Sequence, residues 1–247
     1  MTQKNTGVQE WAEKSVNIQY GCEHNCRYCY ARKMAARFNR IPAEGWDHPI
    51  KKQHFWNTSL PRNTQVMFPS THDITPNNLD MSIGVILSLL NRNNKVLIVS
   101  KPHLKCIKKI LDFCGPREQI EFRFSIGSQN DEVLKYWEPN APRYKERMEC
   151  IKETSEHGFI TSVSCEPLLD NINHGDYTHY FGIPLIEELI LLNGVYPIKE
   201  IWIGAIQYMK GPELDYKAIY ECYKTNPRIR FKDSFLKQAK HHGVVLE

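Results

Sequence analysis

The strongest constraint on the fold is an alternation of short apolar runs with longer segments of helical character. Residues 95–100 (KVLIVS) are almost wholly apolar, as expected for a strand that is buried on both faces of a parallel sheet. A helical segment, 103–113, follows, and the same order recurs roughly every 30 residues along the chain. Repeated strand–helix units of this kind place the strands in one parallel sheet with helices packed on it.

Six or seven such units predict an α/β fold, a partial (β/α)6-type TIM barrel with mostly parallel strands, with a flat doubly wound sheet as the alternative. We expect one domain over 1–247, with a barrel core at about 15–210 and a C-terminal extension, 211–247, packed against it. Loops after the strands then meet on one rim, where function is expected. The predicted strands are 16–20, 65–68, 95–100, 121–126, 160–165, 200–206 and 229–232, and the predicted helices are 30–38, 79–90, 103–113, 143–157, 185–192 and 216–224.

The composition excludes several classes of protein. Hydrophobic residues make up 41% and charged residues 24% of the chain, which is ordinary globular usage and excludes a disordered chain. No uninterrupted apolar stretch is long enough for a membrane span, and the first residues lack the apolar core of a secretion signal. The net charge of +4 is too small to identify a nucleic-acid binder. We therefore expect a cytoplasmic protein without a membrane partner.

The most informative motif is a group of three cysteines directly after the first predicted strand. Cys22, Cys26 and Cys29 form a C-x3-C-x2-C pattern, whereas the other five cysteines are scattered. Three thiolates on one loop can bind three irons of a [4Fe–4S] cluster and leave the fourth iron open for chemistry. The alternative is a zinc site in which His24 supplies the fourth ligand.

With Tyr28 preceding the third cysteine, this motif resembles that of the radical S-adenosylmethionine superfamily. The resemblance implies a [4Fe–4S] cluster on Cys22, Cys26 and Cys29 whose open iron binds S-adenosylmethionine. It implies reductive cleavage of that cofactor to a 5′-deoxyadenosyl radical, which abstracts hydrogen from a substrate. It also implies a flavodoxin- or ferredoxin-type electron donor, and it places Tyr28 near the adenine of the cofactor.

A narrower resemblance is carried by 123–128 (RFSIGS), together with Glu138 and Arg147. These residues are similar to the spore photoproduct lyase branch, which repairs a thymine dimer in DNA. The C-terminal part is similar to phage-associated radical S-adenosylmethionine proteins. The branch resemblance implies radical transfer by Tyr28 and Tyr30, and nucleic acid or a nucleotide as the substrate. Matched residues at the cofactor are Lys101 and Ser125.

One departure from that branch concerns the hydrogen donor. After the second strand the lyase has a cysteine that returns a hydrogen atom to the product, and this chain has Ser70 in the segment 70–73 (STHD). Because an O–H bond is stronger than an S–H bond, lyase-type dimer repair is not expected here. Cys165 at a strand end is a candidate replacement donor, or else a buried core thiol. Its neighbour Glu166 could bind the substrate or the ribose of the cofactor.

The site predicted from the sequence thus has three kinds of residue. The alternative interpretation of the whole chain is a non-enzymatic zinc-binding module that binds nucleic acid through the basic segment between Arg228 and His242. The predicted catalytic residues are Tyr28, Tyr30 and Cys165; the predicted cofactor-binding residues are Tyr28, Thr71, His72, Asp73, Lys101, Ser125, Ser128 and Glu166; and the predicted metal ligands are Cys22, Cys26 and Cys29.

Overall fold

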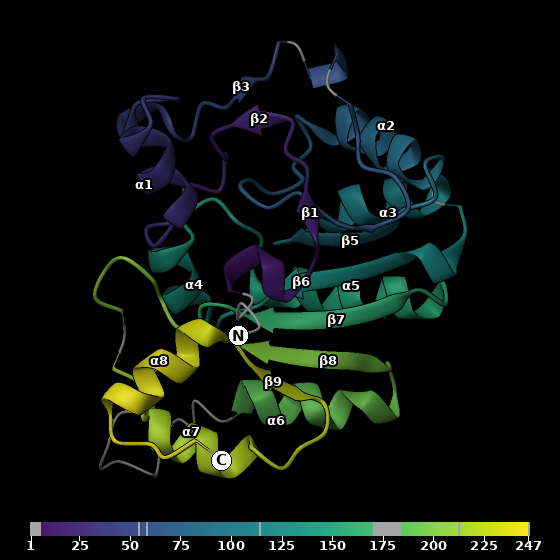
Figure 1. The fold of residues 1–247 in the computed structure, drawn as a ribbon. Coiled ribbons are helices and arrows are strands. Elements are labelled where there is room, and N and C mark those ends of the chain that lie inside the picture. The colour runs from purple at the N-terminus through teal and green to yellow at the C-terminus, as the bar shows by residue number, and fades with distance from the viewer. Residues whose placement is uncertain are drawn as a thin grey trace.

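A single sheet of seven parallel strands forms the frame of the protein (Figure 1). The structure is a computed structural model that describes residues 6–53, 55–57, 59–113, 115–169, 184–211 and 213–246. The strand order is β1-β4-β5-β6-β7-β8-β9, and every neighbouring pair runs parallel. The strands are β1 (Lys14–Ser15), β4 (Gln65–Phe68), β5 (Lys95–Ser100), β6 (Ile120–Ser125), β7 (Ile160–Cys165), β8 (Ile198–Ile203) and β9 (Ile229–Phe231). This open, parallel arrangement confirms the predicted partial barrel.

Helices connect the strands, as the alternating pattern predicted. All six predicted helices are present, within one or two residues at each end. Two further helices, α4 and α8, were not predicted. The helices are α1 (Tyr30–Arg37), α2 (Leu79–Leu90), α3 (Leu104–Phe113), α4 (Asp131–Trp137), α5 (Tyr144–Glu156), α6 (Pro184–Leu191), α7 (Tyr216–Tyr223) and α8 (Asp233–His241), and a 3-10 helix, η1, spans Gly7–Glu10.

Alternation along each strand separates two faces of the sheet. On β7, Val163 and Cys165 point to the main apolar core, which also contains residues of α2, α3, α5, α6, α7 and α8. The side chain between them, Ser164, lines a cavity on the opposite face. The concave face also carries a smaller apolar cluster that includes Met67 and Val99. Successive side chains of a strand point to opposite faces, so strand parity decides which residues reach the concave side.

The prediction of one first strand over 16–20 is wrong. In its place the structure has two short strands: β1 (Lys14–Ser15), which lies in the main sheet and ends before this segment, and β2 (Gln19–Tyr20), which pairs antiparallel with β3 (Ile50–Lys51). Between them, the Ile18 carbonyl accepts from the Lys52 amide (2.9 Å) and the Ile18 amide donates to the His72 ring. These partners lie outside the main sheet, and they draw the chain out of it before the cysteine loop.

The C-terminal segment adds the last strand to one edge of the main sheet. β9 pairs with β8, and α8 packs its buried face, with Phe235 and Ala239, on the main core. No helix in the described part of the chain has the length and apolar character that crossing a membrane requires.

Candidate functional site

A cavity of about 270 Å³ lies on the concave face, at the C-terminal ends of the strands. It brings together most of the site residues predicted from the sequence. They are Cys22, Cys26, Cys29, Tyr28, Tyr30, Thr71, His72, Asp73, Lys101, Ser125 and Glu166. The loops that follow parallel strands thus meet at one rim, as the barrel architecture predicts.

The cysteine loop enters this cavity through a backbone turn that only glycine tolerates. Gly21 has φ +90°, and a Cβ there would lie 2.7 Å from the Trp46 carbonyl oxygen. The adjacent Cys22 amide donates to that same carbonyl at 2.8 Å. The loop ends where α1 begins, and the Arg32 guanidinium of α1 donates back to the Cys26 carbonyl at 2.5 Å. These contacts fix the three sulfur-bearing residues relative to the sheet.

A buried ion pair holds the other side of the loop. The Arg147 guanidinium is fully buried on α5 and pairs with the Glu138 carboxylate, which also accepts from the Tyr28 hydroxyl. Arg147 additionally donates to the Ser125 carbonyl at 3.0 Å. Burial alone would raise the pKa of the Glu138 carboxyl, but Arg147 and Lys101 hold it below its ordinary value. The predicted Tyr28 and Ser125 therefore belong to one hydrogen-bonded network.

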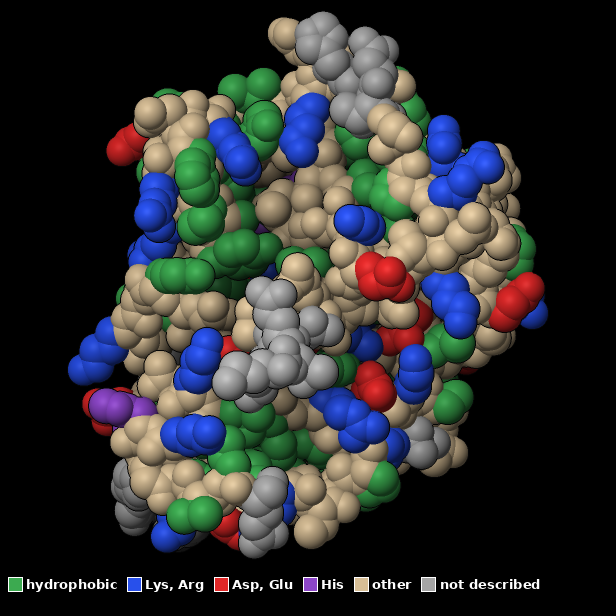
Figure 2. Space-filling model, viewed as in Figure 1, with side chains coloured by type: hydrophobic (Ala, Val, Ile, Leu, Met, Phe, Trp, Pro, Cys, Tyr) green, Lys and Arg blue, Asp and Glu red, His purple; other side chains and the backbone are tan. Residues whose placement is uncertain are grey.

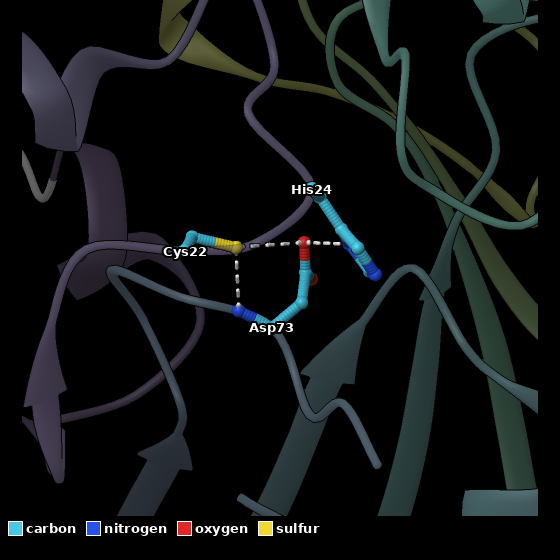
Figure 3. A group of neighbouring side chains, drawn as sticks. All are labelled: Cys22, His24 and Asp73. Carbon is cyan, nitrogen blue, oxygen red and sulfur yellow. Dashed lines mark hydrogen bonds and ion pairs between the residues drawn. The ribbon is translucent and has the colours of Figure 1, made fainter. Parts of the chain in front are cut away.

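Asp73 is the polar centre at the cysteine end of the cavity. Its carboxylate lies 2.8 Å from His24 Nδ1 and 3.5 Å from Lys101 Nζ, and it accepts from the Lys101 amide at 2.8 Å. The Asp73 amide donates to Cys22 Sγ at 3.4 Å, so Asp73 lies between the cysteine and the histidine (Figure 3). Burial opposes ionisation, but Lys101 and His24 hold the pKa of Asp73 well below its usual range.

The three thiols fit a metal cluster better than they fit free cysteines. Burial raises the pKa of Cys22 well above its ordinary value, raises that of Cys26 to about 12 and raises that of Cys29. Thiolates in such surroundings need a compensating positive charge, which iron or zinc ions supply directly. All three side chains line the same cavity. The residues present therefore fit a cluster bound by three thiolates.

The segment after β4 is held by one asparagine side chain. Asn17 Oδ1 accepts from the amides of Ser70 and Thr71, both at 2.8 Å, and its Nδ2 donates to the Ser70 hydroxyl at 2.8 Å. The Tyr30 hydroxyl donates to the Ser70 carbonyl at 2.6 Å. His72 is buried, with Nε2 accepting from the Ile18 amide at 3.2 Å. Tyr30, Thr71 and His72 are thus positioned by protein contacts within the cavity wall.

Two predicted residues lie outside the cavity lining. Cys165 is buried in the main apolar core, because its position on β7 has the parity of Val163 rather than that of Ser164. Ser128 is also fully buried, and its hydroxyl accepts from the Asn130 amide at 2.9 Å, just before α4. Strand parity was visible in the sequence 160–165 (ITSVSC), where the two serines alternate with more apolar residues.

The structure adds a site residue that sequence reasoning missed. Lys232 follows β9 and belongs to the basic C-terminal segment, yet its side chain is buried and lines the cavity. Its ammonium group lies 3.2 Å from Glu166 Oε2, 3.5 Å from Glu10 Oε1 and 3.0 Å from the Gly7 carbonyl oxygen. The signal that could have found it is its position at the C-terminal end of the last predicted strand.

A group with metal-ligand chemistry contains only one of the three cysteines. Ligand atoms of Cys22, His24 and Asp73 all lie within 4.8 Å of one another. His24 Nδ1 contacts Asp73, and its Nε2 contacts His103 Nε2 at 2.8 Å. Both imidazole nitrogens therefore have protein partners in the structure.

Comparisons with known proteins by sequence find two relatives of this chain. No protein-family model matches the chain. The uncharacterized protein ORF301 of Acidianus two-tailed virus is 27% identical over 177 residues, which cover 64% of this chain and 56% of that protein. The uncharacterized protein MJ0683 of Methanocaldococcus jannaschii is 22% identical over 175 residues, which cover 67% and 64%. The chain thus spans somewhat more than half the length of these curated relatives.

Among solved structures, a spore photoproduct lyase mutant matches with a TM-score of 0.54 and 18% identity, over 92% of this chain and 66% of that one. SuiB of Streptococcus suis bound to S-adenosylmethionine also gives 0.54, at 12% identity, over 95% and 51%. Another spore photoproduct lyase mutant, with a TM-score of 0.50, holds AdoMet and a dinucleoside spore photoproduct. At these identities the matches show a shared fold, and they confirm at that level the resemblance to spore photoproduct lyase.

Proposed function

We propose that this chain is a radical S-adenosylmethionine enzyme whose [4Fe–4S] cluster is held by Cys22, Cys26 and Cys29. When bound there, such a cluster would supply the reductive cleavage of S-adenosylmethionine to a 5′-deoxyadenosyl radical, the species that would abstract hydrogen from the substrate. The observation that carries the proposal is the convergence of the three thiols, of which Cys22 and Cys26 are buried, with Asp73 and Lys101 on one ligand-sized cavity. The shared fold with spore photoproduct lyase and SuiB supports it.

The protein's own residues would bind and orient the cofactor. Asp73, ionised between Lys101 and His24, offers acceptor oxygens to the amino group of S-adenosylmethionine, and Thr71 and His72 flank it on the same cavity wall. Lys101 supplies a cation beside Asp73, and this cation compensates the charges of Asp73 and of the thiolates. A cation whose side chain is largely shielded from solvent acts strongly on nearby anions because the local dielectric constant is low.

The sides of the cavity would hold the nucleoside part of the cofactor. Tyr28 offers an aromatic face for the adenine, and its hydroxyl is held by Glu138. Ser125 and Glu166 line the cavity at the ends of β6 and β7, where they could contact the ribose or the substrate. Tyr30, also in the lining, is the proposed partner of Tyr28 in radical transfer. The placement of Ser128 and Cys165 outside the lining gives them no direct contact with this space.

For the substrate, we propose nucleic acid or a nucleotide. Exposed cationic and aromatic side chains occur together on α1 and just after it, including Arg37, Phe38 and Arg40. Such a combination suits phosphates and bases. A low-potential electron donor of the flavodoxin or ferredoxin type is part of the same proposal, because the cluster must be reduced before the cofactor is cleaved.

The test is anaerobic reconstitution with iron and sulfide, followed by dithionite and S-adenosylmethionine, with 5′-deoxyadenosine as the product measured. We expect a brown protein that forms 5′-deoxyadenosine, and no product from Cys26→Ala. The matched control is Cys222→Ala, which removes an exposed thiol on α7 and should leave the product unchanged.

A colourless protein that binds one zinc per chain and forms no 5′-deoxyadenosine would overturn the proposal. That outcome would favour the zinc-binding module, with Cys22, His24 and Asp73 as the place to look for the ion. If the protein is a zinc-binding module and Cys26 is one of the zinc ligands, Cys26→Ala should mainly unfold the loop, because structural zinc contributes folding energy.

A further inference from the structure

The cysteine loop and α1 carry positive charge that no carboxylate neutralises. The stretch 24–43 contains no acidic residue, and its five cations are Arg27, Arg32, Lys33, Arg37 and Arg40. Within the described part of the chain none of these five forms an ion pair, whereas Lys237 on α8 pairs with Asp233 at 2.6 Å. Over the region of α1, Figure 2 shows blue basic side chains among green hydrophobic ones. This face can therefore attract an acidic partner.

Arg27 marks the part of this face that belongs to the cysteine loop itself. It follows Cys26 directly and is exposed. Its amide donates to the Trp137 carbonyl at 2.8 Å, and its Nε donates to the Tyr136 carbonyl at 2.5 Å. The guanidinium carbon lies 4.5 Å from the centroid of the Tyr136 ring, which is 56% exposed. An arginine and a large aromatic ring are thus held side by side on the surface.

The loop separates this surface from the cavity. Cys26 and Cys29, on either side of Arg27 in the motif, line the cavity. Arg27 and Tyr136 are not among the described residues that line it. Arg32 fixes the loop between the two sides, because its guanidinium donates to the carbonyls of both Cys26 and Arg27. An exposed guanidinium therefore lies one residue away from a candidate cluster ligand.

This position suits delivery of an electron better than binding of a substrate. The rate of electron transfer falls steeply with distance, so a carrier must dock close to the group that it reduces. A substrate must instead reach the cavity, whose exposed lining includes Tyr30 and Tyr208. Arginine and tyrosine are also enriched in the contact surfaces of proteins. A redox protein docked on Arg27 and Tyr136 would leave the cavity free for the substrate.

We propose that Arg27 and Tyr136 form the docking surface for an acidic redox protein that reduces the cluster. The inference rests on the proposed function, because it gives the electron donor of that cluster a place on this chain. The carrier loses one electron and the bound cluster gains that electron, and no bond of the chain forms or breaks. Redox encounters use small, transient interfaces that opposite charges steer.

The first test measures binding, which needs no turnover. A fluorescently labelled, oxidised flavodoxin with an acidic surface is titrated with the reconstituted protein, and its anisotropy is followed. At about 0.1 M salt we expect Arg27→Glu to raise the dissociation constant about fivefold, which is less than the effect of a whole steering field, about tenfold or more. At about 1 M salt the difference should shrink, because the screening length falls from about 10 Å to about 3 Å.

Two further variants separate docking from folding of the loop. Lys135→Glu changes an exposed residue of α4 next to Tyr136, leaves the cysteine loop unaltered, and should also weaken binding. The matched control, Lys217→Glu, makes the same change of charge at an exposed position on α7, which lies at the opposite end of the molecule from α1 (Figure 1). It should leave the dissociation constant unchanged. Iron bound per chain shows whether Arg27→Glu still forms the cluster.

The second test compares two reductants in the formation of 5′-deoxyadenosine. Dithionite is small and needs no docking surface, so Arg27→Glu and the unaltered protein should form the product at equal rates. With reduced flavodoxin as the sole reductant, below saturation, Arg27→Glu should be slower by about the factor found for binding. The ratio of the two rates therefore reports docking rather than the chemistry in the cavity.

The inference would be overturned if the unaltered protein did not bind the flavodoxin, or if neither Arg27→Glu nor Lys135→Glu weakened that binding. An equal loss with dithionite would also overturn it, and would assign Arg27 to the stability of the loop. Weaker binding of an oligonucleotide with unchanged binding of the flavodoxin would assign the face to nucleic acid instead. Failure of the proposed function is seen separately, as absence of 5′-deoxyadenosine from the unaltered protein with dithionite.

Discussion

His72 should make the stability of this protein depend on pH in a defined way. Its Nδ1 donates to the Asp73 carbonyl at 3.0 Å, and its Nε2 accepts from the Ile18 amide at 3.2 Å. The Nε2 contact needs the neutral ring, because a proton on Nε2 would face the Ile18 N–H. Burial of the side chain, which is 6% exposed, lowers the pKa of His72 from 6.5 to about 4.

The sign and the size of the effect follow from these two pKa values. As pH falls, the unfolded chain takes up this proton first, near pH 6.5, whereas the folded chain takes it up only near pH 4. The free energy of unfolding therefore decreases across that window and is unaffected by His72 above it. At roughly 1.4 kcal/mol per pH unit, the loss is about 2 kcal/mol by pH 5 and about 3 kcal/mol at the end of the window.

The assay is urea denaturation of the wild type and of His72→Gln at several pH values between about 7 and 5. Glutamine can accept from the Ile18 amide and never ionises, so the variant should gain about 2 kcal/mol relative to wild type across this range. His48→Gln, an exposed histidine with 87% of its side chain accessible, is the matched control. A stability difference between wild type and His72→Gln that stays constant with pH would refute the reasoning.

Three substitutions test the packing around the site. Arg147→Met leaves the Glu138 carboxylate buried without its guanidinium partner, and urea denaturation should show a loss of about 3–5 kcal/mol; an unchanged midpoint would contradict the buried ion pair. Gly21→Ala must keep φ +90° with a Cβ 2.7 Å from the Trp46 carbonyl, so it should cost about 2 kcal/mol or more and lower the iron bound per chain after reconstitution. Phe122→Ala in the main core should cost about 3–5 kcal/mol in the same denaturation assay, and a loss below 1 kcal/mol would show that the core is loosely packed.

Local patterns in the sequence were enough to predict most of the frame. The apolar runs at 65–68, 95–100 and 160–165 are strands with the predicted bounds. Burial on both faces requires such continuous runs, and the requirement leaves a short-range signal. The prediction for 16–20 failed because the groups that hydrogen-bond to the Ile18 backbone are remote in sequence. They are the Lys52 amide and the His72 ring.

The basic composition of the C-terminal segment concealed an amphipathic helix, α8. Residues 233–241 were interpreted as part of a basic tail, but Phe235 and Ala239, four positions apart, form the buried stripe of α8. That spacing is the helical signal. The cationic residues such as Lys237 and Lys240 occupy the exposed face, where they give no information about packing.

One end of the cavity could be predicted from the sequence and the other could not. The reason is the number of residues that separate the side chains in contact at each end. The cysteine end depends on one loop and on loops after neighbouring strands, so a motif of eight residues, 22–29, points to it. The opposite end depends on Lys232 reaching the Gly7 carbonyl across 225 positions of sequence. No local periodicity records a contact of that kind. Because η1 and the segment after β9 close this end of the cavity, substitutions near Gly7 and Lys232 can change what the cavity accepts without changing the cysteine motif.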